Sequence, residues 1–312
     1  MLKRLGVVIA AAAAVVLAAS APVSAITNGQ PDAGGHPQVG ELLFFVPDEP
    51  DSRFDDPGAW FTCSGTLLSN DVVLTASHCT YGVGKDGVST TVDGGNGSGG
   101  DDVWIDFNDA PDFSILPPSS SYGRGQNAQR YHDWAAALNG SGEWHRATSH
   151  PHPQFDPSQF FLHDAGVLRL EHPVQLADHG RISPAGFLDQ FQNGPNHDQR
   201  FTVVGYGLNK ELPHADFGGD VRLAGTVKLI SLNGTFGVEQ GTIARFSNDN
   251  GKTHQGGTCF GDSGGPTFVA GTNQVVAVTS FGLSPNCTGT DDEYRIDQSD
   301  DLAFLASFGI TP

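Results

Sequence analysis

Short β-prone runs recur along this chain, and stretches rich in glycine and proline separate them. The sequence contains 41 glycines and 19 prolines, which supply many turns. Several short strands with turn signals between them are typical of antiparallel sandwiches and barrels rather than of alternating strand and helix units. We therefore expect an all-β fold. The runs are ELLFFV (41–46), DVVLTA (71–76), AGVLRL (165–170), RFTVVGYG (200–207), GTVKLI (225–230) and NQVVAVTSFG (273–282).

One helix is expected near the C-terminus. Ser299 is suited to cap it, and Asp300 and Asp301 favour its first turn. An apolar stripe follows, as expected for a helix that packs on a core. The stripe consists of Leu302, Phe304, Leu305 and Phe308.

The first 25 residues have the order of a secretory signal peptide. Lys3 and Arg4 precede an apolar run over 5–19, and small residues end the segment. The apolar run is shorter than the ~20 residues of a membrane span. We expect residues 1–25 to be removed, which leaves a secreted, extracellular protein of residues 26–312 with no membrane association.

Acidic residues outnumber basic ones, 35 against 16, and the net charge is −19. Such a chain repels nucleic acid and anionic membranes, so neither is expected as a partner. A chain of 312 residues can bury a sizeable core, in one large β domain or two small ones.

The four cysteines stand at positions 63, 79, 259 and 287. An even number in an exported chain predicts two disulfides, although four cysteines allow three pairings. No two are spaced as a C-x₂₋₄-C zinc-ligand pair. We expect no bound metal and no cofactor.

Residues 82–150 differ from their surroundings, because VDGGNGSGGDD (92–102) is glycine-rich and acidic and PPSSSYGRGQNAQ (117–129) holds few core formers. We interpret them as long surface loops that carry a little local structure, not as a separate domain. Oxygen atoms of Asp93, Asn96, Asp101 and Asp102 could hold a cation, but the spacing fits no EF-hand, and a solvated loop is the preferred interpretation.

The segment GGTCFGDSGGPTF (256–268) surrounds Ser263 with five glycines and a proline. Such a loop can turn sharply and direct backbone N–H groups into one small space. Those groups could hold an oxyanion while Ser263 attacks a carbonyl carbon. An ordinary glycine turn is the alternative for this pattern alone.

A serine nucleophile needs a base, and the base needs an orienting carboxylate. His78 directly follows a strand-like run and precedes Cys79, so a disulfide there would fix its position. Asp164 stands at the start of an apolar strand, where a carboxylate becomes buried. Asp156 is the less favoured alternative, because it precedes Pro157 and lacks a following strand.

Three further histidines, at positions 150, 152 and 163, lie near Asp164 in the sequence. They could suggest a metal site. Their spacing forms no helical ligand pair, so exposed loop histidines are the preferred interpretation.

TASHC, HDAGVLRL and GDSGGP, in that order, resemble the three signatures of the chymotrypsin/trypsin-like serine proteases. Supporting motifs match as well, and the resemblance runs from Ile26 to the C-terminus. It implies a serine endopeptidase of two six-stranded antiparallel β-barrels with a C-terminal helix and an active site between the barrels. The stretch from His78 to Asp164 is longer than usual for the family, which makes 82–150 an insertion. The supporting motifs are CSGTLLS (63–69), VVGYG (203–207), TSFG (279–282) and EYRI (293–296).

The resemblance assigns a role to each matching residue. Ser263 would be the nucleophile, His78 the general base and then acid, and Asp164 the orienting carboxylate supported by Ser280. The N–H groups of Gly261 and Ser263 would form the oxyanion hole of an enzyme that works through an acyl-enzyme intermediate. The implied disulfides are Cys63–Cys79 and Cys259–Cys287.

The specificity pocket departs from the trypsin pattern. Gly257 stands where trypsin-type enzymes carry an aspartate, and Gly282 leaves the pocket mouth open. Asp292 falls where the family usually has a glycine in the pocket floor, and it could attract Lys or Arg. The alternative is that Asp291, Asp292 and Glu293 form a solvated acidic loop, because an unpaired buried carboxylate is costly. We expect a broad or apolar/aromatic P1 preference, with a basic one as the rival. The substrate-binding candidates are Gly257, Thr258, Ser280, Phe281, Gly282 and Asp292.

Ile26-Thr27-Asn28-Gly29 resembles the Ile-Val-Gly-Gly start of active family members. In the family the freed ammonium pairs with the aspartate beside the nucleophile, here Asp262. Our hypothesis is that signal peptidase itself frees the Ile26 amine, so that no separate zymogen stage exists.

Two other classes of protein share single features with this chain. A catalytically inactive protease fold used for binding is the main alternative, and the presence of the whole triad disfavours it. An α/β-hydrolase esterase would order its triad Ser…Asp…His, the reverse of this chain. As partners we expect protein or peptide substrates and proteinaceous inhibitors, and we expect a monomer.

Overall fold

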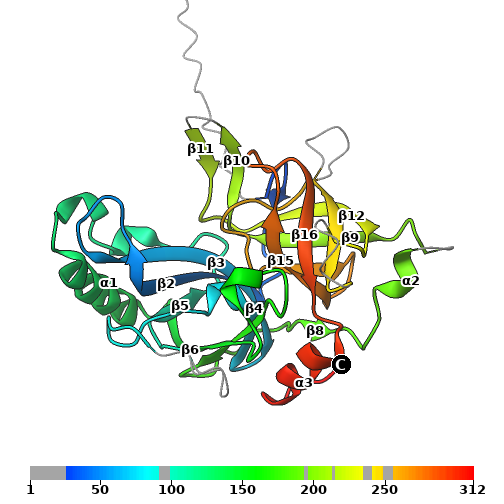
Figure 1. The fold of residues 1–312 in the computed structure, drawn as a ribbon, viewed down its shortest axis with the longest axis horizontal. Helices are drawn as coiled ribbons and strands as arrows, with labels where there is room; N and C mark the ends of the chain where they lie inside the picture. Colours follow the sequence, from blue (N-terminus) through cyan, green and yellow to red (C-terminus); the bar gives the residue numbers. More distant parts are fainter. Residues whose placement is uncertain (1–25, 91–98, 193–195, 213–214, 235–240, 249–255) are drawn as a thin grey trace, which may run out of the picture.

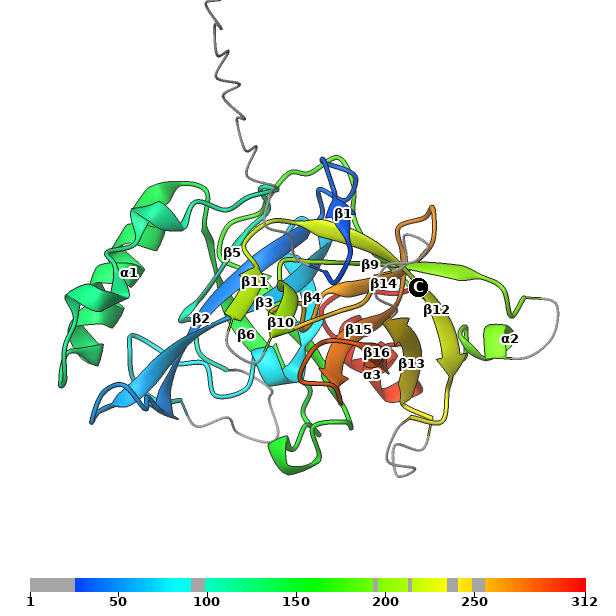
Figure 2. The same cartoon turned by 90° about the horizontal axis from the view of Figure 1, so that it is seen from above.

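The structure is a computed structural model that describes residues 26–90, 99–192, 196–212, 215–234, 241–248 and 256–312. The expected signal peptide, and Asp93 and Asn96 of the acidic loop, lie outside the described residues. The described chain forms two β-barrels, which lie side by side in two perpendicular views (Figures 1 and 2). In the part of the chain described, no helix is long and apolar enough to cross a membrane.

Six antiparallel strands close the first barrel in the order β2-β3-β4-β7-β6-β5. Its inward side chains, among them Leu42, Val73 and Leu168, are fully buried. The strands are β2 (Val39–Pro50), β3 (Pro57–Ser69), β4 (Val72–Ala76), β5 (Val103–Asp106), β6 (His145–Pro151) and β7 (Ala165–Leu170).

The second barrel closes in the order β9-β12-β13-β16-β15-β14, because β14 pairs back onto β9 and β9 onto β12. All six pairings of this ring are antiparallel. Two short strands extend the sheet, β1 (Gln30–Pro31) beside β12 and β8 (Arg181–Ile182) beside β15, and β10 (Leu208–Leu212) and β11 (Ala215–Gly218) form a hairpin. The six barrel strands are β9 (Arg200–Gly205), β12 (Leu223–Ser231), β13 (Ile243–Asn248), β14 (Pro266–Val269), β15 (Gln274–Gly282) and β16 (Gly289–Arg295).

One apolar cluster joins the two barrels. Leu74 and Val167 of the first barrel share it with Tyr206 and Phe268 of the second. This continuous core fixes the barrels against each other, so residues at their junction are held by both. The two-barrel, all-β architecture with a C-terminal helix is the fold expected from the sequence.

Residues 82–150 hold more regular structure than the long loops with a little local structure that we expected. The segment supplies β5 and β6 of the first barrel, a 15-residue helix α1 (Asn127–Ser141) and two short 3₁₀ helices, η2 (Phe113–Ile115) and η3 (Ser119–Ser121). Helix α1 covers the end of the first barrel that faces away from the second (Figures 1 and 2). Its side chains pack with buried Trp104 and Trp144 in a small cluster of their own. The helix has only a weak apolar stripe, so the tryptophans stabilise it; Trp104 comes from the four-residue strand β5 and Trp144 from the bend before β6.

The acidic loop is partly buried rather than fully solvated. Asp102 is fully buried and accepts hydrogen bonds from the Tyr131 hydroxyl at 2.6 Å and the Gly87 N–H at 2.8 Å. Asp101 pairs with Arg146 at 3.0 Å. Both carboxylates therefore help to attach α1 and its flanking segments to the barrel.

The C-terminal helix α3 (Ser299–Ala306) begins one residue earlier than expected, because Gln298 occupies the N-cap position and Ser299 is the first helical residue. Phe304 and Leu305 are buried in the shared core, and Leu302 and Phe308 pack against it. The remaining short helices are η1 (Ser77–Cys79), η4 (Pro157–Gln159) and α2 (Asp189–Gln192). Disulfides join Cys63 to Cys79 and Cys259 to Cys287.

Candidate active site

His78 and Asp164 meet because their strands are paired. His78 lies in η1 directly after β4, Asp164 directly precedes β7, and Ala76 of β4 is paired with Ala165 of β7. The Asp164 carboxylate accepts from the His78 backbone N–H and from the ring Nδ1, each at 2.9 Å. The histidine is thus held in position and in ring orientation by one carboxylate.

Asp164 is fully buried, and Ser280 of β15 donates its hydroxyl to Oδ2 at 2.6 Å. Burial lowers the pKa of the His78 ring, but the charge and hydrogen bond of Asp164 outweigh it and leave the pKa raised above 6.5. A histidine in this setting accepts a proton more readily than a free imidazole.

Ser263 lies on a tight loop braced by the first barrel. Its carbonyl accepts from the Ser64 N–H at 2.8 Å, and the Ser64 hydroxyl donates to the Gly261 carbonyl at 3.1 Å. Gly261 and Gly264 have φ values of +96° and +75°, a region that favours glycine. A Cβ on Gly264 would lie 2.0 Å from Thr75 Oγ1, so the close packing also excludes larger residues.

The cleft between the barrels is lined by His78, Gly261 and Ser263 together. Within the described residues, neither the Gly261 N–H nor the Ser263 N–H donates to a protein acceptor. Two free donors beside a serine hydroxyl are what an oxyanion hole requires.

Asp156, the less favoured orienting acid, is solvent-exposed beside η4, and its carboxylate accepts from the Ser158 N–H at 2.8 Å.

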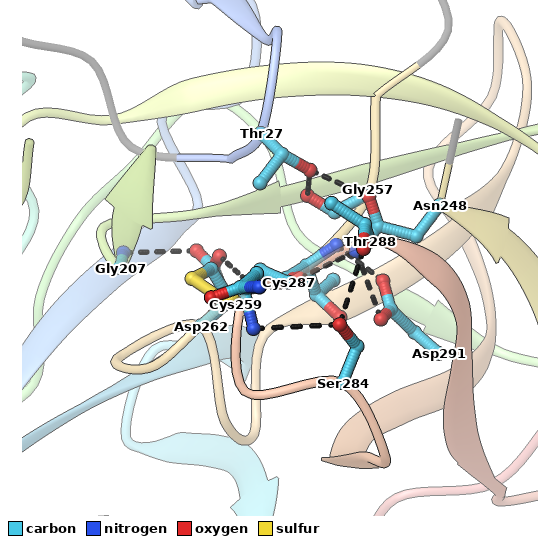
Figure 3. The surroundings of a disulfide bond; sticks show 12 residues. Thr27, Gly207, Asn248, Gly257, Cys259, Asp262, Ser284, Cys287, Thr288 and Asp291 are labelled. Carbon is cyan, nitrogen blue, oxygen red and sulfur yellow. Dashed lines mark hydrogen bonds between the residues drawn. A yellow bond between two sulfur atoms is a disulfide. The ribbon is translucent and has the colours of Figure 1, made fainter. Parts of the chain in front are cut away.

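Asp262, next to Ser263, is fully buried beneath the loop (Figure 3). Its carboxylate accepts from the N–H groups of Gly207 at 2.9 Å and Cys259 at 2.8 Å, and from the backbone N–H of Ile26. Burial raises the pKa of Asp262 to about 7 against these hydrogen bonds. Ile26 is itself fully buried, in the core of the second barrel.

A second pocket, of about 190 Å³, opens beside Ser263. Four of the expected substrate-binding residues line it, together with Asp291, which the sequence analysis did not single out. The lining residues are Thr258, Cys259, Phe260, Ser263, Thr279, Ser280, Phe281, Gly282, Ser284, Cys287 and Asp291.

Asp291, not Asp292, supplies the carboxylate of this pocket. Successive side chains of β16 point to opposite faces, and Asp292 faces Arg245, its pairing partner on β13, with a contact of 3.3 Å. Asp291 accepts from the Thr258 N–H at 2.6 Å. It also accepts from the Asn248 side-chain amide at 2.9 Å (Figure 3). Counting back from Tyr294 in the sequence therefore located the right strand, β16, but chose Asp292, whose side chain lies on the face away from the pocket.

Glu293 shares the Asp291 face of β16, because side chains two residues apart on a strand lie on the same face. Glu293 is fully buried and accepts from the Thr258 hydroxyl at 3.4 Å. Burial raises the pKa of Asp291 to about 6 and that of Glu293 well above its ordinary value. Asp291 is the one carboxyl group among the described residues that line this pocket, and none of these lining residues is a cation.

The expectation that Gly257 binds substrate is wrong for this pocket. Gly257 does not line it and instead pairs with Thr27, whose N–H donates to the Gly257 carbonyl at 2.9 Å. The Thr27 hydroxyl donates to the same carbonyl, also at 2.9 Å (Figure 3). A Cβ on Gly257 would lie 2.0 Å from the Asn248 side chain. A glycine is therefore required at position 257 so that residues 26–27 can pack beside the pocket.

The histidines near Asp164 are not simply exposed, contrary to expectation. His152 is only 5% exposed, and burial together with the nearby His163 lowers its pKa to about 4. His163 is partly buried and has a φ of +55°. His150 is partly buried and its ring contacts Phe308 at 5.1 Å.

The architecture is that of the two-barrel serine proteases, and the trypsin family model matches residues 125–296, more than half of the chain. The chain belongs to the trypsin family. CLIP domain-containing serine protease B15 of Anopheles gambiae is 26% identical over 223 residues, which are 70% of this chain and 54% of that protein. Melanization protease 1 of Drosophila melanogaster is 25% identical, over 72% of this chain and 52% of that protein. The chain thus spans about half the length of these relatives.

Solved structures share the fold. HL collagenase superposes with a TM-score of 0.59 at 17% identity, over 92% of this chain and 100% of that one. The scabies mite inactivated protease paralogue S-D1 superposes with a TM-score of 0.57 at 14% identity, over the same shares.

Proposed function

We propose that this protein is a secreted serine endopeptidase in which Ser263 is the nucleophile, His78 the general base and then acid, and Asp164 the orienting carboxylate. The observation that carries the proposal is the chain of contacts from Ser280 through Asp164 to His78, which opens on the cleft that Ser263 also lines. A buried carboxylate bonded to Nδ1 leaves Nε2 free to take the serine proton.

In the proposed reaction, Ser263 Oγ attacks the carbonyl carbon of a peptide bond as its proton moves to His78. The oxyanion that forms is stabilised by the N–H groups of Gly261 and Ser263. His78 then protonates the leaving amine, which yields an acyl-enzyme on Ser263. A water molecule, deprotonated by His78, hydrolyses this ester and restores the serine.

For the P1 residue we propose Lys or Arg, the rival preference of the sequence analysis. The support is Asp291, whose carboxylate lines the pocket, with Glu293 buried behind it. Buried carboxylates without a cation are costly, and a basic side chain entering the pocket would supply one. Phe281 and the open backbone of Gly282 line the same pocket and would pack on the aliphatic stem of that side chain.

We further propose that residues 1–25 are a signal peptide and that its removal at Ala25–Ile26 yields the active enzyme. Support comes from the position of Ile26, which is buried and whose backbone N–H donates to the Asp262 carboxylate. A freed ammonium at this place would pair with the Asp262 carboxylate and fix the loop of Gly261 and Ser263. N-terminal sequencing of the active secreted protein tests this, and a start at any other residue would contradict it.

The test of activity is labelling with a fluorophosphonate, followed by hydrolysis of a peptide library. We expect covalent labelling on Ser263 and cleavage after one class of P1 residue. The Ser263→Ala variant should lose labelling and about 10⁶ in kcat. A folded protein that neither labels nor cleaves would favour the alternative, an inactive protease fold that binds peptides or proteins.

A further inference from the structure

A cluster of histidine and aspartate side chains lies outside the cleft, where three segments of the chain meet. His152 follows β6, His163 precedes Asp164 and β7, and Asp300 and Asp301 stand in the first turn of α3. One ligand atom from each of His152, His163 and Asp300 lies within 4.8 Å of the other two. The cluster thus links the first barrel to the C-terminal helix.

The side chains of the cluster already face one another. His163 Nδ1 lies 2.9 Å from Asp300 Oδ2, and the rings of His152 and His163 stack with centroids 5.0 Å apart. His152 Nε2 lies 3.9 Å from Asp301 Oδ1. Ligand atoms on a tetrahedral zinc ion with bonds of about 2.0–2.1 Å lie about 3.3 Å apart, so small shifts would complete such a site.

An unsatisfied buried carboxylate oxygen points to a ligand here. Asp301 is fully buried, and its Oδ2 accepts from the Tyr294 hydroxyl at 3.0 Å. Its Oδ1 has no hydrogen-bond partner within the described residues. An orphaned buried acceptor is destabilising, and a cation between Asp301 and His152 would satisfy it.

The backbone of the cluster is strained as well. His163 holds a φ of +55°, which is uncommon for a residue with a side chain. Such conformations persist where the surrounding structure requires them, often at ligand sites. Here the conformation directs the His163 ring toward Asp300 while the next residue, Asp164, turns into the core.

We propose that His152, His163 and Asp300 bind a divalent transition metal of the Zn²⁺ type, with Asp301 Oδ1 facing the fourth position. Two imidazoles and a carboxylate are a donor set that suits Zn²⁺ better than Ca²⁺ or Mg²⁺, which prefer oxygen alone. The metal would lie between Asp300 and His163 Nδ1, which has no hydrogen-bond partner within the described residues. At present His152 Nδ1 accepts a long hydrogen bond from the Gln154 N–H, at 3.2 Å. A metal on Nε2 would move the ring proton to Nδ1, so this hydrogen bond would be lost.

A metal at this place would stabilise the protein by joining α3 to the segment that carries Asp164. Binding to the folded state alone raises the melting temperature in proportion to the logarithm of metal concentration. The site is separate from the proposed catalytic chemistry and does not depend on it.

The test uses full-length secreted protein with Ser263→Ala, so that self-cleavage cannot interfere, after removal of metals with a chelator. Titration with Co²⁺, a spectroscopic substitute for Zn²⁺, should give one equivalent of binding with visible absorption bands that Zn²⁺ abolishes. His163→Gln and Asp300→Asn should weaken binding by more than about tenfold, the loss that removal of even an outer-shell partner causes. Both side chains are partly exposed, so these variants are expected to fold.

Two control variants separate this site from other histidines. His172→Gln removes an exposed imidazole elsewhere, and His78→Ala removes the imidazole of the cleft. Both should bind Co²⁺ as the parent does, and both should keep the rise in melting temperature with Zn²⁺. Absence of saturable binding in the parent, undiminished binding in His163→Gln or Asp300→Asn, or loss in His78→Ala would each overturn the proposal.

Discussion

The carboxylate of Asp164 holds His78 at two points, because one oxygen accepts from the backbone N–H and the other faces the ring Nδ1, each at 2.9 Å. The first bond fixes the main chain of η1, and the second fixes the rotation of the ring. The paired strands β4 and β7 hold both residues, so the geometry is part of the barrel itself.

Replacing this carboxylate should cripple the enzyme without unfolding it. In Asp164→Asn, an amide beside Nδ1 favours the wrong ring tautomer, and we expect kcat to fall about 10⁴-fold. Steady-state hydrolysis of a peptide substrate measures this. Asp156→Asn is the matched control, since Asp156 is exposed beside η4, and it should keep the parental kcat. The reverse outcome would make Asp156 the orienting acid.

The pH profile should report the same contact. Protonated His78 cannot accept the serine proton, and Asp164 raises the ring pKa above 6.5. Activity should therefore rise with pH through a midpoint above 6.5 in plots of kcat/KM. In Asp164→Asn the residual activity should have a lower midpoint, because the raising charge is gone while the burial that lowers the pKa remains. An unchanged midpoint would show that a group other than His78 controls the rise of activity with pH.

The pocket residue Asp291 should determine the response to basic substrates. A charge-assisted hydrogen bond contributes about 1.5–3 kcal/mol, so Asp291→Asn should lower kcat/KM for Lys and Arg substrates roughly 10- to 100-fold and leave Phe substrates nearly unaffected. Asp292→Asn is the neighbouring control, because Asp292 pairs with Arg245 away from the pocket. Equal losses for basic and aromatic substrates would mean that Asp291 only supports the pocket wall.

The sequence alone was enough for much of this fold, because local signals and tertiary packing agree there. Six apolar runs bounded by glycine and proline became strands β2, β4, β7, β9, β12 and β15. The regular structure of the 82–150 segment was underestimated because its order comes from distant contacts. Helix α1 is stabilised by tryptophans of other segments and by the Tyr131 bond to Asp102, neither of which leaves a local periodic pattern.

The candidate site shows the same division. Motifs with fixed spacing, such as those around His78 and Ser263, located residues that the fold brings to one cleft. The pocket base could not be found by counting, because Asp291 and Asp292 differ only in which face of β16 they occupy. That face is set by the pairing of Arg245 with Asp292 across the sheet. Register is a property of two strands, and one sequence segment does not contain it.

The hydroxyl of Tyr131 should contribute measurably to stability. It donates to the fully buried Asp102, so Tyr131→Phe removes one of three donors to a carboxylate that stays buried. We expect a loss of about 1–3 kcal/mol in the free energy of unfolding, measured by urea denaturation in Ser263→Ala. Tyr122→Phe is the control, because its hydroxyl bonds Asp133 near the surface, and it should change stability by less than about 0.5 kcal/mol.

Cleavage before Ile26 should change how stability depends on pH. In the uncut chain, burial raises the pKa of Asp262 from 3.8 to about 7, so between these values the folded protein binds more protons than the unfolded one. Stability of the uncut protein should therefore fall as pH rises from about 4 to 7. After cleavage, the Ile26 ammonium favours the ionised form of the Asp262 carboxylate. Cleavage also removes the peptide bond that defines the φ angle of Ile26, so its unfavourable value of +54° is no longer required.

Melting curves of Ser263→Ala protein measure this difference, with residues 1–25 attached in one sample and with Ile26 as the first residue in the other. The raised pKa of Asp291 contributes to both curves and cancels in their difference. The melting temperature of the cut form should fall less between pH 4 and 7 than that of the uncut form. The cut form should lose this extra stability as the Ile26 amine deprotonates, at a pKa that the pairing with Asp262 raises above the ordinary value of about 7.7–8.0. Activity of the cut enzyme should decline over the same alkaline range, because the loop of Gly261 and Ser263 loses its anchor. Parallel melting curves would show that the Ile26 amine does not reach Asp262, and the switch at this junction would have to lie elsewhere.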